Sequence, residues 1–235
     1  MITPGLAETA AAMRAGRPIV LVDDIGRWGG GDLIFAAELA TPELMAFAVR
    51  HTSGFVCVSL PEDDADRLEL PLQAARHDGV RPAYTVSVDA KSDGTGISAT
   101  HRSQTARLLA GLSTEVDALT RPGHIVPVRV RAGGVLAQPG RAEAAHDLAL
   151  VAGLRPVCVH ASIVSVIDST LMADEQELND FARQHSLSIT SVSVIAKSTG
   201  RLARPVQGAG AGAHAEFRWP AVSRALFRRR SFTAQ

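Results

Sequence analysis

Aromatic side chains are scarce in this chain of 235 residues. Phe, Trp and Tyr make up 4% of the sequence, whereas apolar residues as a whole make up 46%. A chain of this length can bury a substantial core. That core must therefore be aliphatic, built from Val, Leu, Ile and Ala, and the length suits one domain or one domain with a tail.

The chain also lacks an excess of charge of either sign. Lys plus Arg and Asp plus Glu number 24 each. No overall field therefore attracts nucleic acid or a membrane surface, and neither is expected as a partner. No stretch approaches the ~18 uninterrupted apolar residues that a membrane-spanning helix needs, and the N-terminus lacks the basic-then-apolar pattern of a signal peptide.

Cysteine is rare as well. Cys57 and Cys158 are the two cysteines, and each lies within an apolar run. Buried free thiols are favoured over a disulfide, which indicates a reducing compartment. Together with the missing signal peptide, this predicts a cytoplasmic protein.

The strongest local pattern lies near the N-terminus. An apolar run at residues 18–22 ends in Asp23 and Asp24, four glycines follow, and the chain leaves through Asp32 into a second apolar run at 33–37. Ligand sites are commonly built where a buried strand ends in acids and glycines, because glycine lets the backbone approach a ligand closely. The alternative is a glycine-rich hairpin turn with solvated aspartates.

Start signals and periodicity predict an alternation of helices and strands. Thr-Pro pairs at 3–4 and 41–42 combine an N-cap hydroxyl with a proline whose missing N–H costs nothing there, and Ser98 is a third cap. Strands are expected at 55–60, 84–90, 124–130, 135–137, 156–166 and 188–195, and helices at 142–151 and 174–185. This order predicts the α/β (α+β) class: a single-domain mixed sheet with packed helices.

The composition changes beyond residue 200. Residues 208–212 alternate Gly and Ala, as in a linker, and residues 228–230 are three arginines. The chain is therefore predicted to hold one domain at 1–200 and a linker-like basic tail at 201–235. A solvated tail is favoured over an RNA-binding patch.

Several motifs match one known family. Residues 16–24 read Gly-Arg-Pro-Ile-Val-Leu-Val-Asp-Asp, and after Arg27 residues 31–38 read Gly-Asp-Leu-Ile-Phe-Ala-Ala-Glu. Further matches are Arg50-His51…Ser53-Gly54…Cys57-Val58, Gly94-Thr95-Gly96-Ile97-Ser98-Ala99, Arg121-Pro122-Gly123-His124 and Gly133-Gly134-Val135-Leu136. In these motifs, from about residue 5 to about residue 200, the chain resembles 3,4-dihydroxy-2-butanone 4-phosphate synthase.

The resemblance implies that family's fold and chemistry. The family converts ribulose 5-phosphate, with magnesium, to a four-carbon phosphate and formate in riboflavin biosynthesis. Its members are homodimers whose sites are completed across the subunit interface, so a homodimer and a small-molecule substrate are expected here. The segment 121–130 and the aliphatic strands also offer more apolar surface than one small sheet readily covers.

Two metal-ligand positions of the family are replaced. The family's loop Arg-Glu-Asn-Glu-Gly-Asp, whose first Glu is a ligand, aligns with Arg27-Trp28-Gly29-Gly30-Gly31-Asp32. The second ligand is the His of a Gly-His-Thr-Glu motif, which aligns with Gly140-Arg141-Ala142-Glu143. A guanidinium cannot ligate a metal ion, and magnesium prefers oxygen ligands. These replacements imply a metal-independent site with no cofactor.

Substrate positions of the family are replaced too. An Arg and a Thr that hold the phosphate fall on Gln138 and Ala142, and a catalytic Glu falls on Ser162. By contrast Arg27, Asp32, the turn at 95–98 and His124 are retained. Taken singly, Arg27 is a surface arginine, Asp32 a turn cap and His124 a core histidine, but their survival within the matched framework favours functional roles for Asp32 and His124.

These replacements lead to the hypothesis of a diverged enzyme. It would abstract a proton next to a carbonyl, with elimination, rearrangement or isomerisation of a substrate other than the family's. His124 is expected as general acid/base, Asp32 as second base or hydroxyl anchor, and Arg141 as oxyanion stabiliser. The expected substrate contacts are Trp28, as a stacking wall, and Arg27, Thr95, Ser98, Gln138, Glu143 and Ser162.

Two other functions stay open. One is the family's own reaction, with Asp23, Asp24 and Glu143 holding magnesium. The other is a non-catalytic binding or regulatory protein, because a protein without activity would tolerate the same replacements. Formate release from ribulose 5-phosphate that EDTA abolishes would select the first, and tight binding without turnover would select the second.

Overall fold

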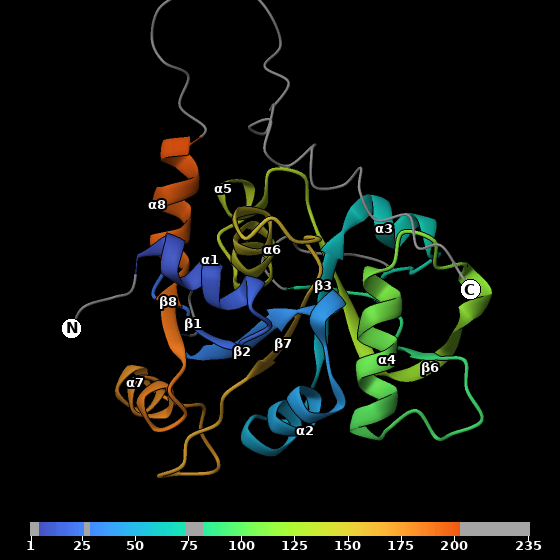
Figure 1. The fold of residues 1–235 in the computed structure, drawn as a ribbon, viewed down its shortest axis with the longest axis horizontal. Helices are drawn as coiled ribbons and strands as arrows, with labels where there is room; N and C mark the ends of the chain where they lie inside the picture. The colour runs from blue at the N-terminus through green and yellow to red at the C-terminus, as the bar shows by residue number, and fades with distance from the viewer. Residues whose placement is uncertain (1–4, 26–28, 74–81, 203–235) are drawn as a thin grey trace, which may run out of the picture.

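The fold is one mixed β-sheet with helices on both faces (Figure 1). The computed structural model describes residues 5–25, 29–73 and 82–202. Within these residues the sheet has eight strands in the order β4-β6-β3-β7-β2-β1-β8, with β5 paired to β6. The predicted class is thereby confirmed. The strands are β1 (Ile19–Val22), β2 (Gly31–Ala36), β3 (Cys57–Pro61), β4 (Ala83–Tyr84), β5 (Val88–Ala90), β6 (Leu119–Val130), β7 (Cys158–Ser162) and β8 (Ser188–Ser191).

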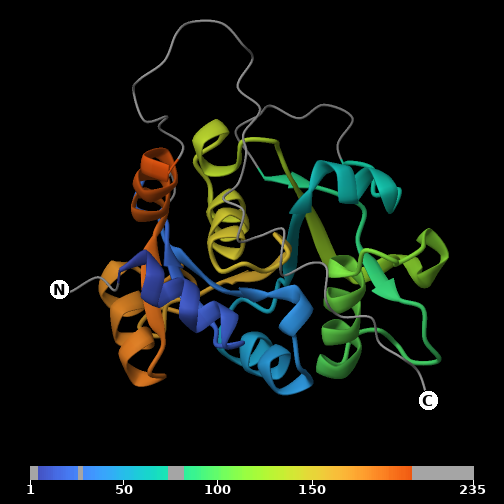
Figure 2. The same ribbon diagram turned by 45° about the horizontal axis from the view of Figure 1, so that its top comes forward.

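Two sets of helices cover the two faces of the sheet with separate apolar clusters. One set packs on Ile19, Leu21 and Ile34: α1 (Leu6–Arg14), α5 (Gly134–Ala137), α6 (Arg141–Val151) and α8 (Val192–Leu202). The other set packs on Val20, Leu33 and Phe35: α2 (Pro42–His51), α3 (Glu62–Arg67), α4 (Ala99–Ala110) and α7 (Glu175–Gln184). Because successive strand residues point to opposite faces, β1 and β2 supply both clusters. Figure 2 shows α7 and α8 along the same edge of the molecule.

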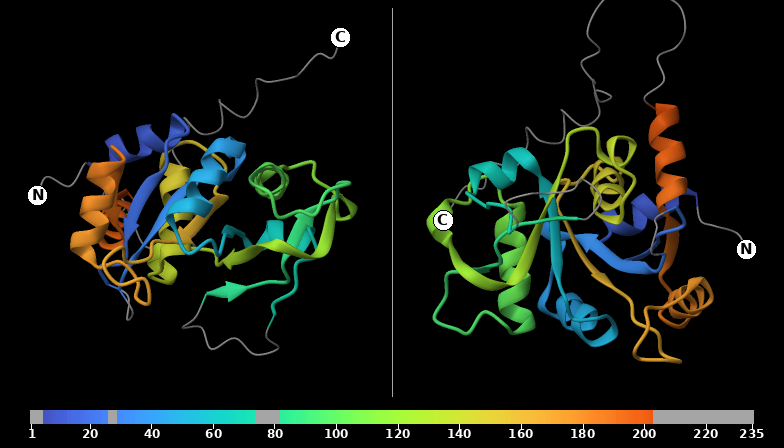
Figure 3. Two further views of the ribbon diagram at one scale, coloured as in Figure 1. Left: turned by 90° about the horizontal axis from the view of Figure 1, so that it is seen from below. Right: turned by 180° about the vertical axis from the view of Figure 1, so that it is seen from behind.

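Strands from distant parts of the chain lie side by side in the centre of the sheet. β7 pairs antiparallel with both β2 and β3, and β3 pairs parallel with β6. At one edge, β1 pairs parallel with β8. Both views of Figure 3 place α4, β5 and β6 at one end of the molecule, and α7, α8 and β8 at the other.

The core is aliphatic, as the composition predicts. Among the largest fully buried side chains of the described residues, Phe35 is the one aromatic. Cys57 and Cys158 are buried free thiols, which confirms that prediction. Burial raises the pKa of Cys57 to about 12, so its thiol is not a nucleophile at neutral pH.

Two predicted helix caps are confirmed. The Thr41 hydroxyl accepts a hydrogen bond from the Leu44 N–H at 3.1 Å, with Pro42 at the first helical position of α2. Ser98 caps α4 by accepting from the His101 N–H at 3.2 Å. The pair at 3–4 lies outside the described residues, and the helix that follows it begins at Leu6.

One predicted strand is wrong and another is wrong in part, and hydrogen bonds from other elements explain both. Residues 135–137 belong to helix α5, because the Asp147 carboxylate accepts from the Val135 N–H at 3.1 Å and fixes this turn. Residues 188–195 form a strand only to Ser191. The Asp24 carboxylate then accepts from the Ser193 N–H at 2.9 Å, which starts α8.

Helix α8 runs past the predicted domain boundary at residue 200 and ends at Leu202. Residues 203–235 lie outside the described residues, so the basic tail stays a prediction. No described helix combines the length and apolar character needed to span a membrane.

Candidate active site

A buried polar cluster lies where β2 and β7 run side by side beneath the start of α6. Asp32 of β2 is paired with Ser162 of β7 in the antiparallel register. The Ser162 hydroxyl and the Arg141 Nη1 both donate to Asp32 Oδ1, each at 2.7 Å. The His160 Nδ1 lies 3.2 Å from Asp32 Oδ2. Three of the predicted site residues, Asp32, Arg141 and Ser162, are therefore in contact.

The Asp32 carboxylate is held in its ionised form. Burial alone would raise its pKa, but the His160 hydrogen bond, the charges of Arg141 and His160 and the Ser162 hydroxyl outweigh burial and lower it. A general base needs a pKa near the working pH. The cluster therefore favours the anchor role predicted for Asp32 over the role of second base.

Arg141 is the exposed member of this cluster. It is the first residue of α6, and its side chain is 27% exposed, against 3% for Asp32. The guanidinium Nε lies 3.9 Å from Asp23 Oδ2. A Cβ on Gly30 would come within 4.0 Å of Arg141 Nη1, so the glycine-rich loop also approaches the guanidinium. Arg141 is thus the charged member of the cluster that a ligand can reach.

A second cluster lies around His124 and also includes Asp89 and Gly96, which come from two other segments of the chain. Its Nδ1 lies 2.6 Å from Asp89 Oδ2, and its backbone N–H donates to Asp89 Oδ1 at 2.9 Å. Gly96 covers this pair with a φ of +79°, and a Cβ there would lie 2.0 Å from Asp89 Oδ2. The turn that carries the predicted contacts Thr95 and Ser98 therefore lies against His124, although the Ser98 hydroxyl itself caps α4.

This arrangement orients His124 as a general acid/base. With the Asp89 carboxylate accepting from Nδ1–H, Nε2 is left as the reactive nitrogen. The His124 side chain is 38% exposed, so a substrate can reach it. Sequence reasoning missed Asp89, because it stands in the polar phase of the alternating run 84–90, where a solvated side chain is expected, and only the structure shows that it is buried.

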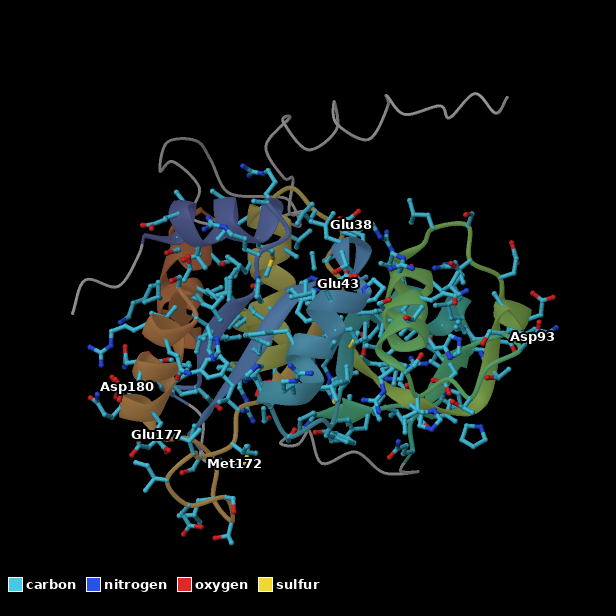
Figure 4. All side chains as sticks on the ribbon, turned by 60° about the horizontal axis from the view of Figure 1, so that its bottom comes forward. Glu38, Glu43, Asp93, Met172, Glu177 and Asp180 are labelled. Atoms are coloured by element: carbon cyan, nitrogen blue, oxygen red, sulfur yellow. The ribbon has the colours of Figure 1, made fainter. Side chains whose placement is uncertain are left out.

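The two clusters are not in contact. The registers pair Asp32 with Ser162, Cys57 with His160 and Cys57 with Val126. Extended by two residues, these registers place Ser162 opposite Phe55 and Phe55 opposite His124. His124 therefore lies three strand spacings from Asp32, which is about 14 Å at ~4.8 Å per strand. Figure 4 shows Asp93, just before the turn at 94–98, and Met172 on opposite sides of the molecule in this view.

The other predicted contacts have mixed outcomes. Glu143 is 6% exposed, and burial raises its pKa, which makes it a poor ionic ligand. Gln138 directly follows α5, and within the described residues its side chain makes no hydrogen bond to either cluster. Asp24 was an alternative magnesium ligand, but its carboxylate accepts hydrogen bonds from Ser191 and Ser193 near the start of α8. Arg27 and Trp28 lie outside the described residues.

Asp147 is a buried carboxyl that sequence reasoning also missed. It is 4% exposed, and burial, reinforced by Glu143 one turn away and opposed by the Val135 hydrogen bond, raises its pKa from 3.8 to about 6. The folded state therefore prefers the protonated form. The stability that this preference contributes is complete below about pH 4 and is lost as the pH rises through 6.

Asp147→Asn should remove this pH dependence. The amide oxygen can still accept from the Val135 N–H, but the side chain no longer ionises. From pH 4 to pH 7 the free energy of unfolding of the variant should gain about 1–3 kcal/mol relative to the parent. Urea unfolding at both pH values measures it, with Asp180→Asn, an exposed carboxylate on α7, as control. A gain that is the same at both pH values would contradict the prediction.

Comparisons with known proteins match the whole fold. The model of the 3,4-dihydroxy-2-butanone 4-phosphate synthase family matches residues 7–198. The riboflavin biosynthesis protein RibBA of Mycobacteroides abscessus is 51% identical over 189 residues, which are 80% of this chain and 45% of the relative. RibBA of Nocardia farcinica is 52% identical over 189 residues, 80% of this chain and 46% of the relative. The chain thus spans about half the length of these relatives.

Solved structures agree. The 3,4-dihydroxy-2-butanone 4-phosphate synthase of Candida albicans is 38% identical, with a TM-score of 0.78, covering 85% of this chain and 99% of that one. A synthase of this kind in complex with two magnesium ions is 36% identical, with a TM-score of 0.78, covering 84% of this chain and 97% of that one.

These comparisons correct two predictions. Relatives about half identical are riboflavin biosynthesis proteins, so the hypothesis of a diverged enzyme with another substrate is wrong, and the family reaction is better supported. The magnesium-bound synthase contradicts the prediction of no cofactor. Sequence reasoning gave a few replaced polar positions more weight than the agreement of the whole framework around them.

The described residues do not by themselves fit a magnesium ion. Arg141 neutralises the Asp32 carboxylate, and His160 and Ser162 take further acceptor positions on it. Across 5–25, 29–73 and 82–202, no three His, Cys, Asp or Glu side chains form a group that could hold a metal.

Proposed function

Because the chain belongs to the 3,4-dihydroxy-2-butanone 4-phosphate synthase family, we propose that it forms 3,4-dihydroxy-2-butanone 4-phosphate and formate from ribulose 5-phosphate. The observation that carries the proposal is the His124–Asp89 pair, which supplies an oriented acid/base to a chain with this family's fold. Residues 1–200 are proposed to carry the activity, with 201–235 as a tail. The buried free cysteines support a cytoplasmic location.

His124 is proposed to move the protons. The reaction begins with proton abstraction next to the carbonyl of the sugar phosphate, which gives an enediolate. The exposed imidazole, held by Asp89, can accept that proton at Nε2 and return it later. Thr95, on the turn packed against this pair, is proposed to bind substrate hydroxyls.

Arg141 is proposed to bind the negative charge of the substrate. Its guanidinium is permanently charged and has five N–H donors, so it can bind an oxyanion while it holds Asp32. The low dielectric around the buried Asp32 strengthens such contacts. Ser162 and Asp32 are proposed to hold the guanidinium in place.

A homodimer is proposed, with a site completed across the interface. Two observations support it. His124 does not reach Asp32 within one chain. In addition, two apolar side chains are each 53% exposed: Ile97 in the turn at 94–98, and Phe55 just before β3. A partner that covers them would hide apolar surface and bring the clusters together. Light scattering that finds a strict monomer at micromolar concentration would contradict this arrangement.

The activity is tested by following formate. Purified protein with ribulose 5-phosphate and magnesium should release formate. If the chain uses the ion that a related synthase binds, although the described residues form no ligand group for it, EDTA should stop the release. Excess magnesium after EDTA should restore it. Tight binding of ribulose 5-phosphate without formate under any of these conditions would instead favour a binding protein.

A further inference from the structure

His160 is the member of the Asp32 cluster to which the proposed roles assign nothing. It lies on β7 two residues before Ser162, so both side chains point to the α6 face of the sheet. The registers place it opposite Ile34 on β2 and Cys57 on β3. It is 7% exposed, so it belongs to the interior of the sheet.

The hydrogen bonds of Asp32 give His160 a distinct place. A carboxylate has about four acceptor positions on its two oxygens. Arg141 and Ser162 both use Oδ1, whereas His160 is the one donor to Oδ2 within the described residues. A turn of the carboxylate about its Cβ–Cγ bond moves both oxygens, so it would break the His160 contact on Oδ2 as well as the two contacts on Oδ1. The His160 donor therefore holds the carboxylate plane from the side that Arg141 and Ser162 leave free, and thereby supports the direction in which Arg141 is held.

The second ring nitrogen shows that stability alone does not explain this residue. The His160 Nε2 is buried, and the described part of the chain provides no partner for it. A buried polar atom without a partner lowers stability. An apolar side chain at this position would avoid that cost.

We infer that His160 is a positioning residue, which fixes the plane of the Asp32 carboxylate and through it aims the Arg141 guanidinium at an oxyanion of the substrate. This inference rests on the proposed function only for the identity of that oxyanion. His160 and Asp32 form the buried part of this relay, because their side chains are 8% and 3% exposed, against 27% for Arg141.

Two substitutions separate positioning from packing. His160→Asn places an amide N–H where Nδ1 lies and removes Nε2, whereas His160→Leu fills the space without a donor. With ribulose 5-phosphate, the Leu variant should raise KM about tenfold with a smaller change in kcat, the effect of one lost hydrogen bond to a charged group. The Asn variant should stay within about threefold of the parent in KM.

A readout without turnover tests the same inference. In ¹⁵N NMR of the side chains, the guanidinium signal of Arg141, assigned with Arg141→Lys, should show slow rotation in the parent and in His160→Asn, and fast rotation in His160→Leu. This result supports the inference even if the parent releases no formate, in which case the proposed function alone fails. Equal rotation in all three proteins, or equal acceleration in both variants, would overturn the inference.

Discussion

Replacing His124 with alanine should slow formate release from ribulose 5-phosphate by about a hundredfold to ten-thousandfold, the range for loss of a general acid/base. The reason is that Nε2 of this imidazole is the reactive nitrogen left free by the 2.6 Å contact between Nδ1 and Asp89. Asp89→Asn should also lower kcat, because an amide no longer imposes the tautomer. Steady-state kinetics at saturating substrate and magnesium measure both.

A matched control is His185→Gln. His185 packs against Phe181 and Phe47 on the α2 and α7 side of the sheet, away from the face that holds α6, so its loss should leave kcat unchanged. If His185→Gln lost as much activity as His124→Ala, the loss would be a general effect of removing a histidine.

Mixing variants tests whether His124 acts on the partner's cluster. His124→Ala and Arg141→Gln should each be poorly active alone. In a shared site, randomly mixed dimers restore one of the two sites in half of the molecules, about a quarter of parental activity. If the mixture is no more active than its components, His124 serves the cluster of its own chain.

Replacing Asp32 with alanine should lower the free energy of unfolding by about 3 kcal/mol, the lower part of the range for breaking a buried ion pair. The substitution leaves the Arg141 guanidinium, the Ser162 hydroxyl and the His160 ring without their shared acceptor. The lower part applies because the Arg141 side chain is 27% exposed and can partly hydrate. Urea unfolding gives the value.

The matched control is Asp66→Ala, which removes an aspartate whose Oδ1 lies 2.6 Å from the Arg129 Nη1. The Asp66 side chain is 67% exposed, so its loss should cost at most about 1 kcal/mol. Adding Arg141→Met to Asp32→Ala should recover part of the loss, because no unpaired charge then remains. Equal losses in Asp32→Ala and Asp66→Ala would contradict the interpretation of Asp32 as a buried anchor.

The sequence predicts the strands and helices whose causes are local. Thr41 and Ser98 cap the helices that begin directly after them, and the apolar runs at β1, β2 and β3 form central strands. The elements that were assigned wrongly depend on distant groups. Asp24 starts α8 from 169 positions away, and Asp147 fixes α5 from the next helix. Neither contact follows from the apolar periodicity or cap signals of the segment that it fixes.

The site was predictable to a similar extent. Motif alignment placed Asp32, Arg141 and Ser162 in one site, and they are in contact. It could not find His160, because a histidine in an apolar run has no local signal until the register of β7 against β2 is known. It also joined His124 to Asp32, although the sheet separates them by several strands.

The parallel pairing of β1 with β8 has a consequence for how the chain reaches this structure. Asp24 and Ser193, which fasten this edge, are 169 positions apart. At ribosomal rates of 5–20 residues per second, β1 waits roughly 10–30 s for its partner strand to be synthesised. Until then its outer edge exposes unpaired backbone groups that can pair with another chain. Closing this edge is a late, long-range step, and until it is complete the N-terminal hairpin is open to pairing with another chain.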